Sequence, residues 1–412
     1  MKRNMIKLAA GAAAVLMMTT SAHAGYTMKK KVGDVDTKLT FFGFAQLEAV
    51  GGKGMQIKNA KSVAKAGTNV GFRAQRIRLG WKYVAGNLRG KVFLDFNQDS
   101  TQNSLGGSKA TNGAAVPKYI KDAFIAYKFN NAFIPKLGVI KMPNGMGFTM
   151  PGWNLDIAER GFDKSLVLER NMGLMISGRA IGGSGKVNGF EMGHDRAWTG
   201  FGYDVMVANQ ASRSSATGTK NVSNGSSALG GNSYAVRGMF DATEKLHVEA
   251  SYGLSENADG KDKITTSGIN YSNINVGIDS NLGELSLKAE YTKAHNIQGI
   301  KDYDEDTYTA TAAYFVMDNL ELVAKTIQGS ATKGTTAKTT DLGNTYLGFN
   351  LFLSQPHSDF SRGSKKGRNQ HKVVFNYIVA NGSGATEVAA NKWSGLSGYR
   401  ANAFIAQYQF KF

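Results

Sequence analysis

The sequence predicts an all-β fold: a transmembrane antiparallel β-barrel of about sixteen strands, with short periplasmic turns and long external loops. Three observations support this prediction. The last segment, 399–412, alternates apolar and polar residues and ends on the aromatic Phe412. Similar alternating segments recur along the chain, and the connections between them are short and long in turn. After the N-terminal segment 1–24, no stretch is apolar for long enough to form a spanning helix, so any crossing of a membrane falls to strands.

The N-terminal segment 1–24 has the pattern of a secretory signal peptide. A basic start precedes an apolar run at 8–18, and the small residues Ala22 and Ala24 mark a cleavage site. The apolar run is too short to cross a bilayer, which argues against a membrane anchor. We therefore expect an exported chain in which residues 25–412 form the barrel.

Strands are expected wherever residues alternate between apolar and polar with a period of two. The predicted strands lie near 37–50, 70–84, 87–98, 119–130, 133–141, 171–180, 198–210, 232–242, 244–254, 268–279, 282–293, 306–316, 318–328, 344–354, 370–381 and 399–412. Abundant glycine, at 50 residues against 5 prolines, suits many strands and tight turns. Two predicted periplasmic turns, 181–197 and 355–369, are longer than usual, so an overlooked strand pair could change the count to about fourteen or eighteen.

Composition narrows the set of partners that the chain can have. The formal net charge is +18, the chain has no cysteine, and its mean hydropathy of −0.28 fits a barrel with a polar lumen as well as a soluble protein. So basic a chain could bind nucleic acid. An exported chain is better matched to small anions or to the anionic lipopolysaccharide surface, so we expect no nucleic-acid partner.

The second and third predicted strands carry a row of bases on one parity. In the second strand, Ile77 and Leu79 alternate with the bases, so one face is apolar and the other cationic. The bases are Arg76, Arg78, Lys82, Arg89 and Lys91. A charge on the lipid face would cost on the order of 2–4 kcal/mol at mid-membrane, so the bases should point into the lumen, where they would attract anions. Alternatively, they pair with Asp95, Asp122 and Glu290 and only hydrate the wall.

The connection 142–170 is the longest, and it combines Trp153 with a helix-like stretch at 155–170. A loop of this length can fold into a barrel and set its narrowest point, or it can cap the surface. The bases that could line such a constriction are Lys141, Arg160, Lys164 and Arg170, and the acids that would temper them are Asp156, Glu159, Asp163 and Glu169.

Several stretches of the chain resemble the phosphate-selective porin O and P family. They lie at 72–100, 122–129, 137–148, 168–178, 344–354 and 371–379. The similar features are a basic second strand, the strand end LGVIKMPNG before the long loop, and the start LERNMG of the sixth strand. The resemblance implies a trimeric channel of about sixteen strands, often anion-selective. Within it, Arg76 and Arg78 match the basic motif and Lys141 matches the strand end, whereas the family's phosphate-binding lysine cluster finds no match here.

We therefore predict an outer-membrane channel for passive diffusion of small hydrophilic solutes, with a preference for anions that could include phosphate or other oxyanions. The alternatives are a general or cation-preferring porin and a barrel scaffold for a periplasmic partner. Expected partners are the solutes, outer-membrane lipid and lipopolysaccharide, and further copies of the chain in a homotrimer. We expect no cofactor, metal site or enzymatic activity, because the histidines lack metal-ligand spacing and no serine nucleophile motif is present.

Overall fold

The structure is a computed structural model of the chain. It describes residues 25–52, 70–96, 119–192, 198–209, 231–256, 269–297, 301–333, 338–353, 369–383, 398–399 and 401–412. The predicted signal peptide lies outside the described residues, as do large parts of several external loops.

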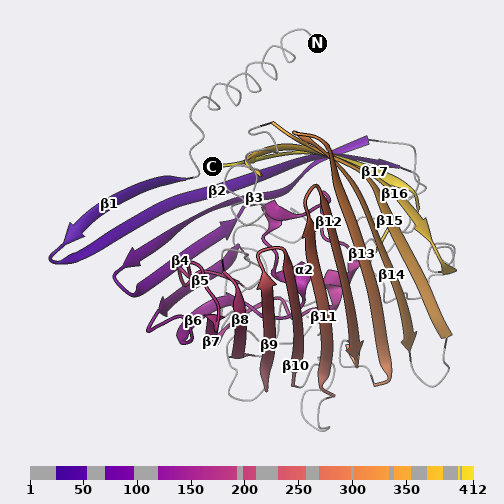
Figure 1. Cartoon of the computed structure of the whole chain (residues 1–412). Helices are drawn as coiled ribbons and strands as arrows, with labels where there is room; N and C mark the ends of the chain where they lie inside the picture. Colours follow the sequence, from indigo (N-terminus) through magenta and orange to yellow (C-terminus); the bar gives the residue numbers. More distant parts are fainter. Residues whose placement is uncertain are drawn as a thin grey trace.

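The described strands form one antiparallel sheet of 17 strands. They are β1 (Tyr26–Val32), β2 (Val35–Gly52), β3 (Val70–Ala85), β4 (Leu88–Asp95), β5 (Ile120–Tyr127), β6 (Ile134–Lys141), β7 (Arg170–Ile181), β8 (Gly200–Asn209), β9 (Asn232–Thr243), β10 (Leu246–Ser255), β11 (Tyr271–Leu282), β12 (Leu285–His295), β13 (Tyr303–Met317), β14 (Leu320–Lys333), β15 (Lys338–Phe352), β16 (His371–Asn381) and β17 (Ala403–Lys411). Every predicted strand is present, as β2 to β17 in order (Figure 1).

The sheet closes into a barrel. From β2 to β17 each strand pairs with the next, and β17 pairs with β2, from Ala403 opposite Gly52 to Lys411 opposite Phe44. The terminal Phe412 extends this ladder, because its backbone N–H and C=O form hydrogen bonds of 3.0 and 3.1 Å with Gly43. The closed ring of 16 strands confirms the predicted barrel and leaves no edge between its first and last strands.

The long turn between β7 and β8 does not change the strand count. Its described residues contain an isolated bridge between Gly185 and Trp198 but no additional strand pair. Of the other long turn, 355–369, only the last residue is described. Within the described ranges, no helix is long and apolar enough to cross a membrane.

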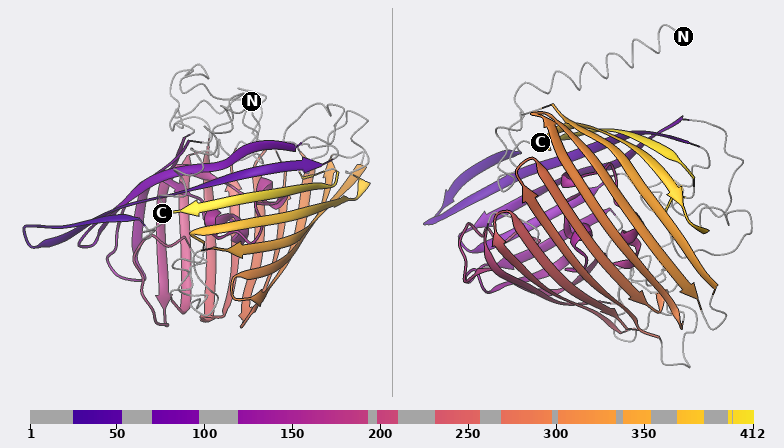
Figure 2. Two further views of the ribbon diagram at one scale, coloured as in Figure 1. Left: turned by 90° about the horizontal axis from the view of Figure 1, so that it is seen from above. Right: turned by 45° about the vertical axis from the view of Figure 1, so that its right-hand side comes forward.

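The first strand, β1, was not expected from the sequence. Its residues, YTMKKKV, hide the alternation behind successive lysines. β1 pairs with the first part of β2, from Tyr26 opposite Phe41 to Val32 opposite Val35, whereas β17 pairs with the second part. β1 and β2 therefore form a hairpin that projects from the ring (Figure 2).

The wall has an apolar outer face and a polar inner face. On β3, Ile77 and Leu79 are 40% and 39% exposed, whereas the side chain of Arg78 between them is only 11% exposed. On β12, Leu287 is exposed while the neighbouring Ser286 is buried. The alternation predicted for these strands is therefore confirmed, with apolar residues toward lipid and polar residues toward the lumen.

A bulge breaks this alternation between β2 and β3. Gln46 pairs with Arg76, but the next residue, Leu47, pairs with Ala74, so β3 has one residue more than β2 at this point. The extra residue re-aims the side chains that follow. As a result Arg73 and Arg76 both face the lumen although they lie on opposite parities.

A second bulge lies between β4 and β5. Asp122 pairs with Phe93, whereas Ile120 pairs with the next residue, Leu94, so Lys121 is the extra residue. Lys121 and Asp122 are adjacent in sequence, and both side chains are directed toward acids and bases of the inner wall. The bulge therefore adds a base to the lumen that strict alternation would place in lipid.

The connection between β6 and β7 lies inside the ring, where Figure 1 shows its helix. It contains α2 (Met146–Thr149) and the short 3-10 turns η1 (Gly152–Asn154) and η2 (Phe162–Leu166). Its backbone binds inward-facing side chains of distant strands. The N–H of Met146 donates to Asn275 on β11 at 3.2 Å, and the N–H of Ala158 donates to Asn376 on β16 at 2.9 Å.

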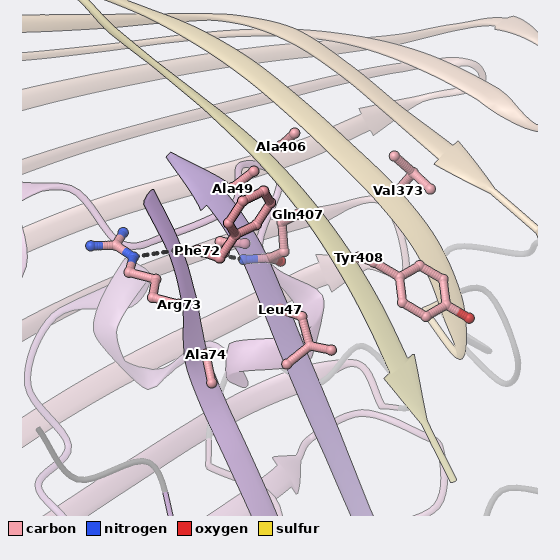
Figure 3. Close-up of a pocket in the computed structure, with 10 residues that line it drawn as sticks. Leu47, Ala49, Phe72, Arg73, Ala74, Val373, Ala406, Gln407 and Tyr408 are labelled. Carbon is pink, nitrogen blue, oxygen red and sulfur yellow. Dashed lines mark hydrogen bonds and ion pairs between the residues drawn. The ribbon is translucent and has the colours of Figure 1, made fainter. Parts of the chain in front are cut away.

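A hollow of about 610 Å³ lies on the outer wall across β2, β3, β16 and β17 (Figure 3). The small residues Ala49, Ala74 and Ala406 form part of its lining, and Leu47 and Phe72 flank them. Phe72 is 85% exposed. The apolar side chains of the lining face away from the lumen, whereas Glu48, Arg73 and Gln407 face inward, so the hollow opens on the outer surface of the wall.

Candidate functional site

A group of bases lies on the inner wall beside the folded loop, and we call it the central cluster. Its members are Arg76, Arg78, Lys91, Lys121, Lys141, Arg160 and Arg170. They come from β3 to β7 and from the loop between β6 and β7. The cluster is close enough for its charges to act on one another and on two acids of the wall, Asp95 and Asp122.

Asp95 on β4 holds two of these bases. Arg78 Nε lies 2.9 Å from Asp95 Oδ2, and Lys121 Nζ lies 3.6 Å from the same oxygen. The guanidinium of Arg78 also lies over the rings of Phe44 and Phe93, at 5.6 and 5.9 Å from their centroids. Aromatic faces support a cation in this way without cancelling its charge. Arg78 is therefore fixed in orientation and still cationic.

Asp122 on β5 forms ion pairs with two further bases of the cluster. Arg170 Nε lies 3.0 Å from Asp122 Oδ1, and Lys91 forms an ion pair with the other oxygen. Arg170 also lies over the ring of Phe148, 5.9 Å from its centroid. Asp122 thus joins β4 to the start of β7, and one carboxylate faces two cations.

Lys141 and Arg160 hold the turn 148–150 of the loop. Lys141 Nζ donates to the carbonyls of Phe148 and Thr149 at 2.7 and 3.1 Å. Arg160 Nη2 donates to the carbonyls of Phe148, at 3.2 Å, and Met150. Carbonyl oxygens are neutral acceptors, so these hydrogen bonds position the loop without removing the two positive charges.

The pKa values of two loop residues, Arg160 and Glu169, indicate a positive electrostatic environment. Burial, together with the nearby charges of Arg76 and Arg78, lowers the pKa of Arg160 well below its usual range. Burial alone would raise the pKa of Glu169, but its ion pair with Lys164 outweighs this, and the pKa of Glu169 falls to about 2. A cation destabilised and a carboxylate stabilised by neighbouring cations are both expected where bases exceed acids.

Arg76 binds the part of the loop that approaches β2. Its Nη1 donates to Gln46 Oε1, and Gln46 in turn donates to the carbonyl of Gly152 at 3.1 Å. A Cβ at Gly152 would lie 3.3 Å from Arg76 Nε, so glycine permits the close approach. Gln46 thus links the base to the loop backbone.

The remaining predicted bases lie elsewhere. Lys82 lies between Phe42 and Phe190, with its Nζ 5.1 and 5.3 Å from the two ring centroids. Arg89 donates to the carbonyl of Asn188, in the long turn between β7 and β8, at 2.7 Å. Both lie at the periplasmic end of their strands. Lys164 lies on the loop, paired with Glu169, as described above.

Solvent reaches only part of the central cluster. The side chains of Arg78, Lys91 and Arg170 are each 11% exposed, and that of Lys121 is 22% exposed. Lys141 and Arg160 are buried. Lys121 is therefore the most accessible base of the cluster. Sequence alternation does not place Lys121 or Arg73 in the lumen, because each lies at or beside a bulge.

The loop is tied to the opposite wall as well. Lys288 Nζ on β12 lies 2.5 Å from Asp156 Oδ2, and Lys372 Nζ on β16 donates to the carbonyl of Leu155 at 2.8 Å. Gln407 on β17 donates to the carbonyl of Ala158 at 2.8 Å. Burial tends to raise the pKa of Asp156, but Lys288 outweighs it and the net shift is downward. The loop therefore crosses the lumen between two anchored sides.

The arrangement suits solute passage. Among the described residues, no group of histidine and acidic side chains is placed to hold a metal ion. The polar residues instead line a wall and a loop, where a solute can meet several charges in succession.

A closed barrel of 16 antiparallel strands with a loop folded into its lumen is the fold of a porin, and solved structures bear this out. The structure of Salmonella typhi OmpF in complex with daunomycin has a TM-score of 0.57, with 12% identity over 93% of this chain and 100% of that one. The anion-selective porin from Comamonas acidovorans has a TM-score of 0.55, with 12% identity over 91% and 100% of the two chains. Outer-membrane-expressed OmpT of Vibrio cholerae has a TM-score of 0.54, with 12% identity over 94% and 100%. At this identity the likeness concerns the fold alone.

The match to a protein family is more specific than the likeness of fold. The model of the family "Phosphate-selective porin O and P" matches residues 53–298, more than half of the chain. The chain belongs to this family, which confirms the resemblance seen in the sequence. No curated protein matches the chain significantly.

Proposed function

We propose that the chain forms an outer-membrane channel for the passive diffusion of small hydrophilic solutes, with a preference for anions. The observation that carries the proposal is the central cluster, in which seven bases outnumber the acids whose charges act on them, namely Glu48, Asp95, Asp122, Glu159 and Glu169. In a narrow lumen with low-dielectric walls, such an excess concentrates anions and repels cations.

Oxyanions are the solutes that the cluster fits best. Arginine offers a planar fork of donors that matches phosphate and carboxylate, and its charge persists across the physiological pH range. Arg78 and Arg170 both reach the solvent of the lumen while aromatic rings fix their orientation. The name of the family supports phosphate as one candidate solute.

The loop between β6 and β7 is the proposed constriction. Its contacts with β2, β11, β12, β16 and β17 support this role, because they hold it across the lumen at the level of the central cluster. A scaffold that encloses a periplasmic partner would need a wide lumen, so the loop disfavours that alternative. The fold and family also favour a channel over an enzyme.

A general porin is the second candidate, and the ion pairs of the wall favour it. Asp95 binds Arg78 and Lys121, and Asp122 binds Lys91 and Arg170. If these acids offset most of the field of the bases, the wall would be hydrated but weakly selective.

We further propose a homotrimer in the outer membrane, exported by cleavage of the signal peptide 1–24. A structural neighbour with a TM-score of 0.52 is described as the trimer form of Vibrio cholerae OmpT, which supports this assembly. The outer wall around the hollow of Figure 3 offers a contact surface for a neighbouring copy, because Phe72 projects beside small residues. Lipid and lipopolysaccharide would cover the rest.

The test is the reversal potential of the purified protein in a planar bilayer under a KCl gradient. We expect a potential that favours chloride, reduced by Arg76→Ala combined with Arg78→Ala and by added phosphate. A potential near zero, or one that favours potassium, would leave a general porin. No conductance at all would refute the channel.

A further inference from the structure

We infer that the turn between β7 and β8, in its described residues 182–192, forms a second narrow point at the periplasmic end of the lumen, where Phe190 and Lys82 control passage. The inference rests on the proposed channel function. It assigns the control of exit to residues outside the central cluster and outside the loop between β6 and β7.

Bases of successive strands hold the turn by its backbone carbonyls. The hydrogen bonds are Lys128 Nζ to Val187 O at 2.6 Å, Arg89 Nε to Asn188 O at 2.7 Å, Lys136 Nζ to Glu191 O at 3.3 Å, Arg179 Nη2 to Glu191 O at 3.3 Å and Arg237 Nη2 to Met192 O at 2.5 Å. The donors come from β4, the turn after β5, β6, β7 and β9, so the turn is fastened to a broad arc of the wall.

The burial of three of these donors shows that the turn covers the inner wall at this level. Lys136, Arg179 and Arg237 face inward, yet they are only 2%, 1% and 1% exposed. In an open, water-filled lumen, inward-facing bases would be solvated. Asp204 on β8 compensates two of them, with distances of 2.8 Å to Arg179 and 2.6 Å to Arg237. The two buried arginines are therefore paired with a carboxylate, and Lys136 is held by a carbonyl.

The turn also has its own internal bonds. The carboxylate of Glu191 accepts the N–H groups of Asn188 and Gly189 at 2.5 and 2.7 Å. The side chain of Asn188 accepts the N–H of Phe190 at 2.8 Å. Val187 is buried in the core that surrounds Phe124, and Phe190 packs against it. The position of Phe190 is therefore fixed by the hydrogen bond to its backbone and by the packing of its ring against the core.

Phe190 meets the row of bases that descends β3. Its ring lies 6.5 Å from that of Phe124 and 5.3 Å from Lys82 Nζ. Lys82 follows Arg78 on the same face of β3, in the periplasmic direction. An anion that leaves the central cluster along this face would next meet Lys82, beside the ring of Phe190. Phe190 is only partly buried, so it can border the path.

The pair combines steric and electrostatic control. An aromatic ring at a narrow point displaces water, which by itself would hinder any ion. The ammonium of Lys82 offsets that penalty for anions and adds to it for cations. Size selection would therefore depend on Phe190 and charge selection on Lys82.

The test uses the absence of cysteine from the chain. In Phe190→Cys, a negatively charged methanethiosulfonate reagent modifies the introduced thiol during recording in a planar bilayer. We expect modification to lower conductance at least about twofold and to reduce the preference for anions, because it adds bulk and negative charge at a narrow point. The matched control is Phe201→Cys, whose side chain is exposed on the outer wall and whose modification should change neither quantity.

Two further variants separate the roles and guard against a cysteine variant that does not fold. Phe190→Ala should admit larger uncharged solutes in liposome-swelling assays and keep the preference for anions, whereas Lys82→Met should weaken that preference. Heat-modifiable electrophoretic mobility verifies the folded barrel in each case. Unchanged solute cut-off in Phe190→Ala together with unchanged conductance on labelling would overturn the inference. If the unmodified protein does not conduct, the proposed channel itself fails instead.

Discussion

The adjacent residues Lys121 and Asp122 offer the sharpest test of the electrostatic argument, because both face the lumen and carry opposite charges. Lys121 is the most accessible base of the central cluster, and Asp122 binds Lys91 and Arg170. We expect Lys121→Gln to weaken the preference for chloride over potassium. We expect Asp122→Asn to strengthen it, because two bases lose their shared counter-charge.

The size of the effect follows from Coulomb's law. One unit charge about 6 Å from a permeating ion changes its energy by about 0.7 kcal/mol in a fully hydrated lumen and by about 3 kcal/mol at an effective dielectric constant near 20. The lower figure corresponds to about a threefold change in local ion concentration, with opposite signs for anions and cations, so the permeability ratio should change about tenfold. The higher figure is an upper limit, because Lys121 is 22% exposed and therefore partly screened.

The assay is the reversal potential in a planar bilayer under a KCl gradient, at low and high salt, since exposed charges are screened above about 1 M salt. Lys301→Gln is the matched control, because it removes the same charge from an exposed external turn. Shifts of opposite sign for Lys121→Gln and Asp122→Asn, with none for the control, would support the reasoning. Shifts of the same sign, or no shift in either variant, would show that the bases of the wall do not set selectivity.

Three other predictions concern the loop between β6 and β7, the assembly of copies of the chain, and the turn between β7 and β8. Asp156→Asn should release the loop from Lys288 and increase open-channel noise in single-channel records. Asp163→Asn is its control, because Asp163 lies in the same loop and forms no ion pair with the wall within the described residues. Equal noise in both variants would contradict the anchoring role. Because the pKa of Asp156 is lowered in the fold, this anchor is present above about pH 4, the ordinary range of an aspartate, and should be lost in the wild type only as pH falls through the lower folded value. If the chain forms the proposed trimer, Phe72→Glu should shift it toward monomer in semi-native electrophoresis, whereas Phe201→Glu on another part of the outer wall should not. Retention of the trimer in both variants would exclude this surface. Glu191→Gln should loosen the turn between β7 and β8 and raise the conductance noise without changing the sign of the reversal potential; a quiet record would mean that the carbonyl bonds alone hold the turn.

Alternation was sufficient to predict the barrel because a period of two is imposed by the strand itself and by the contrast between lipid and water. Every strand of the ring could be located, and residues such as Ile77 and Leu79 could be assigned to the outer face. The same rule could not find Arg73 or Lys121, because a bulge depends on how two strands pair and not on one strand's pattern. Two adjacent charges, as at Lys121 and Asp122, are the only local hint of such a bulge.

The long-range contacts of the site could not be predicted from the sequence either. Asn144 and Asn273 form mutual hydrogen bonds although 129 residues separate them, and no local pattern links the two. The role of Gly152 is apparent only from the structure, in which the side chain of Arg76 lies close to its backbone. The turn between β7 and β8 is longer than usual in the sequence, but of the bases that bind its carbonyls only Arg89 could be assigned to the lumen from the sequence.

The pairing of the bases with Asp95 and Asp122 does not by itself weaken the case for an anion channel. Conduction requires a solute to bind well enough to enter and loosely enough to leave. A narrow lumen lined by the same bases without counter-charges would hold an oxyanion tightly and would also be costly to fold, since buried like charges repel. Asp122, shared by Lys91 and Arg170, leaves each cation only partly compensated, so an arriving anion can compete for both and then be displaced by the carboxylate. On this reasoning Asp122→Asn should increase selectivity and at the same time slow the passage of phosphate, a combination that a merely hydrated wall would not produce.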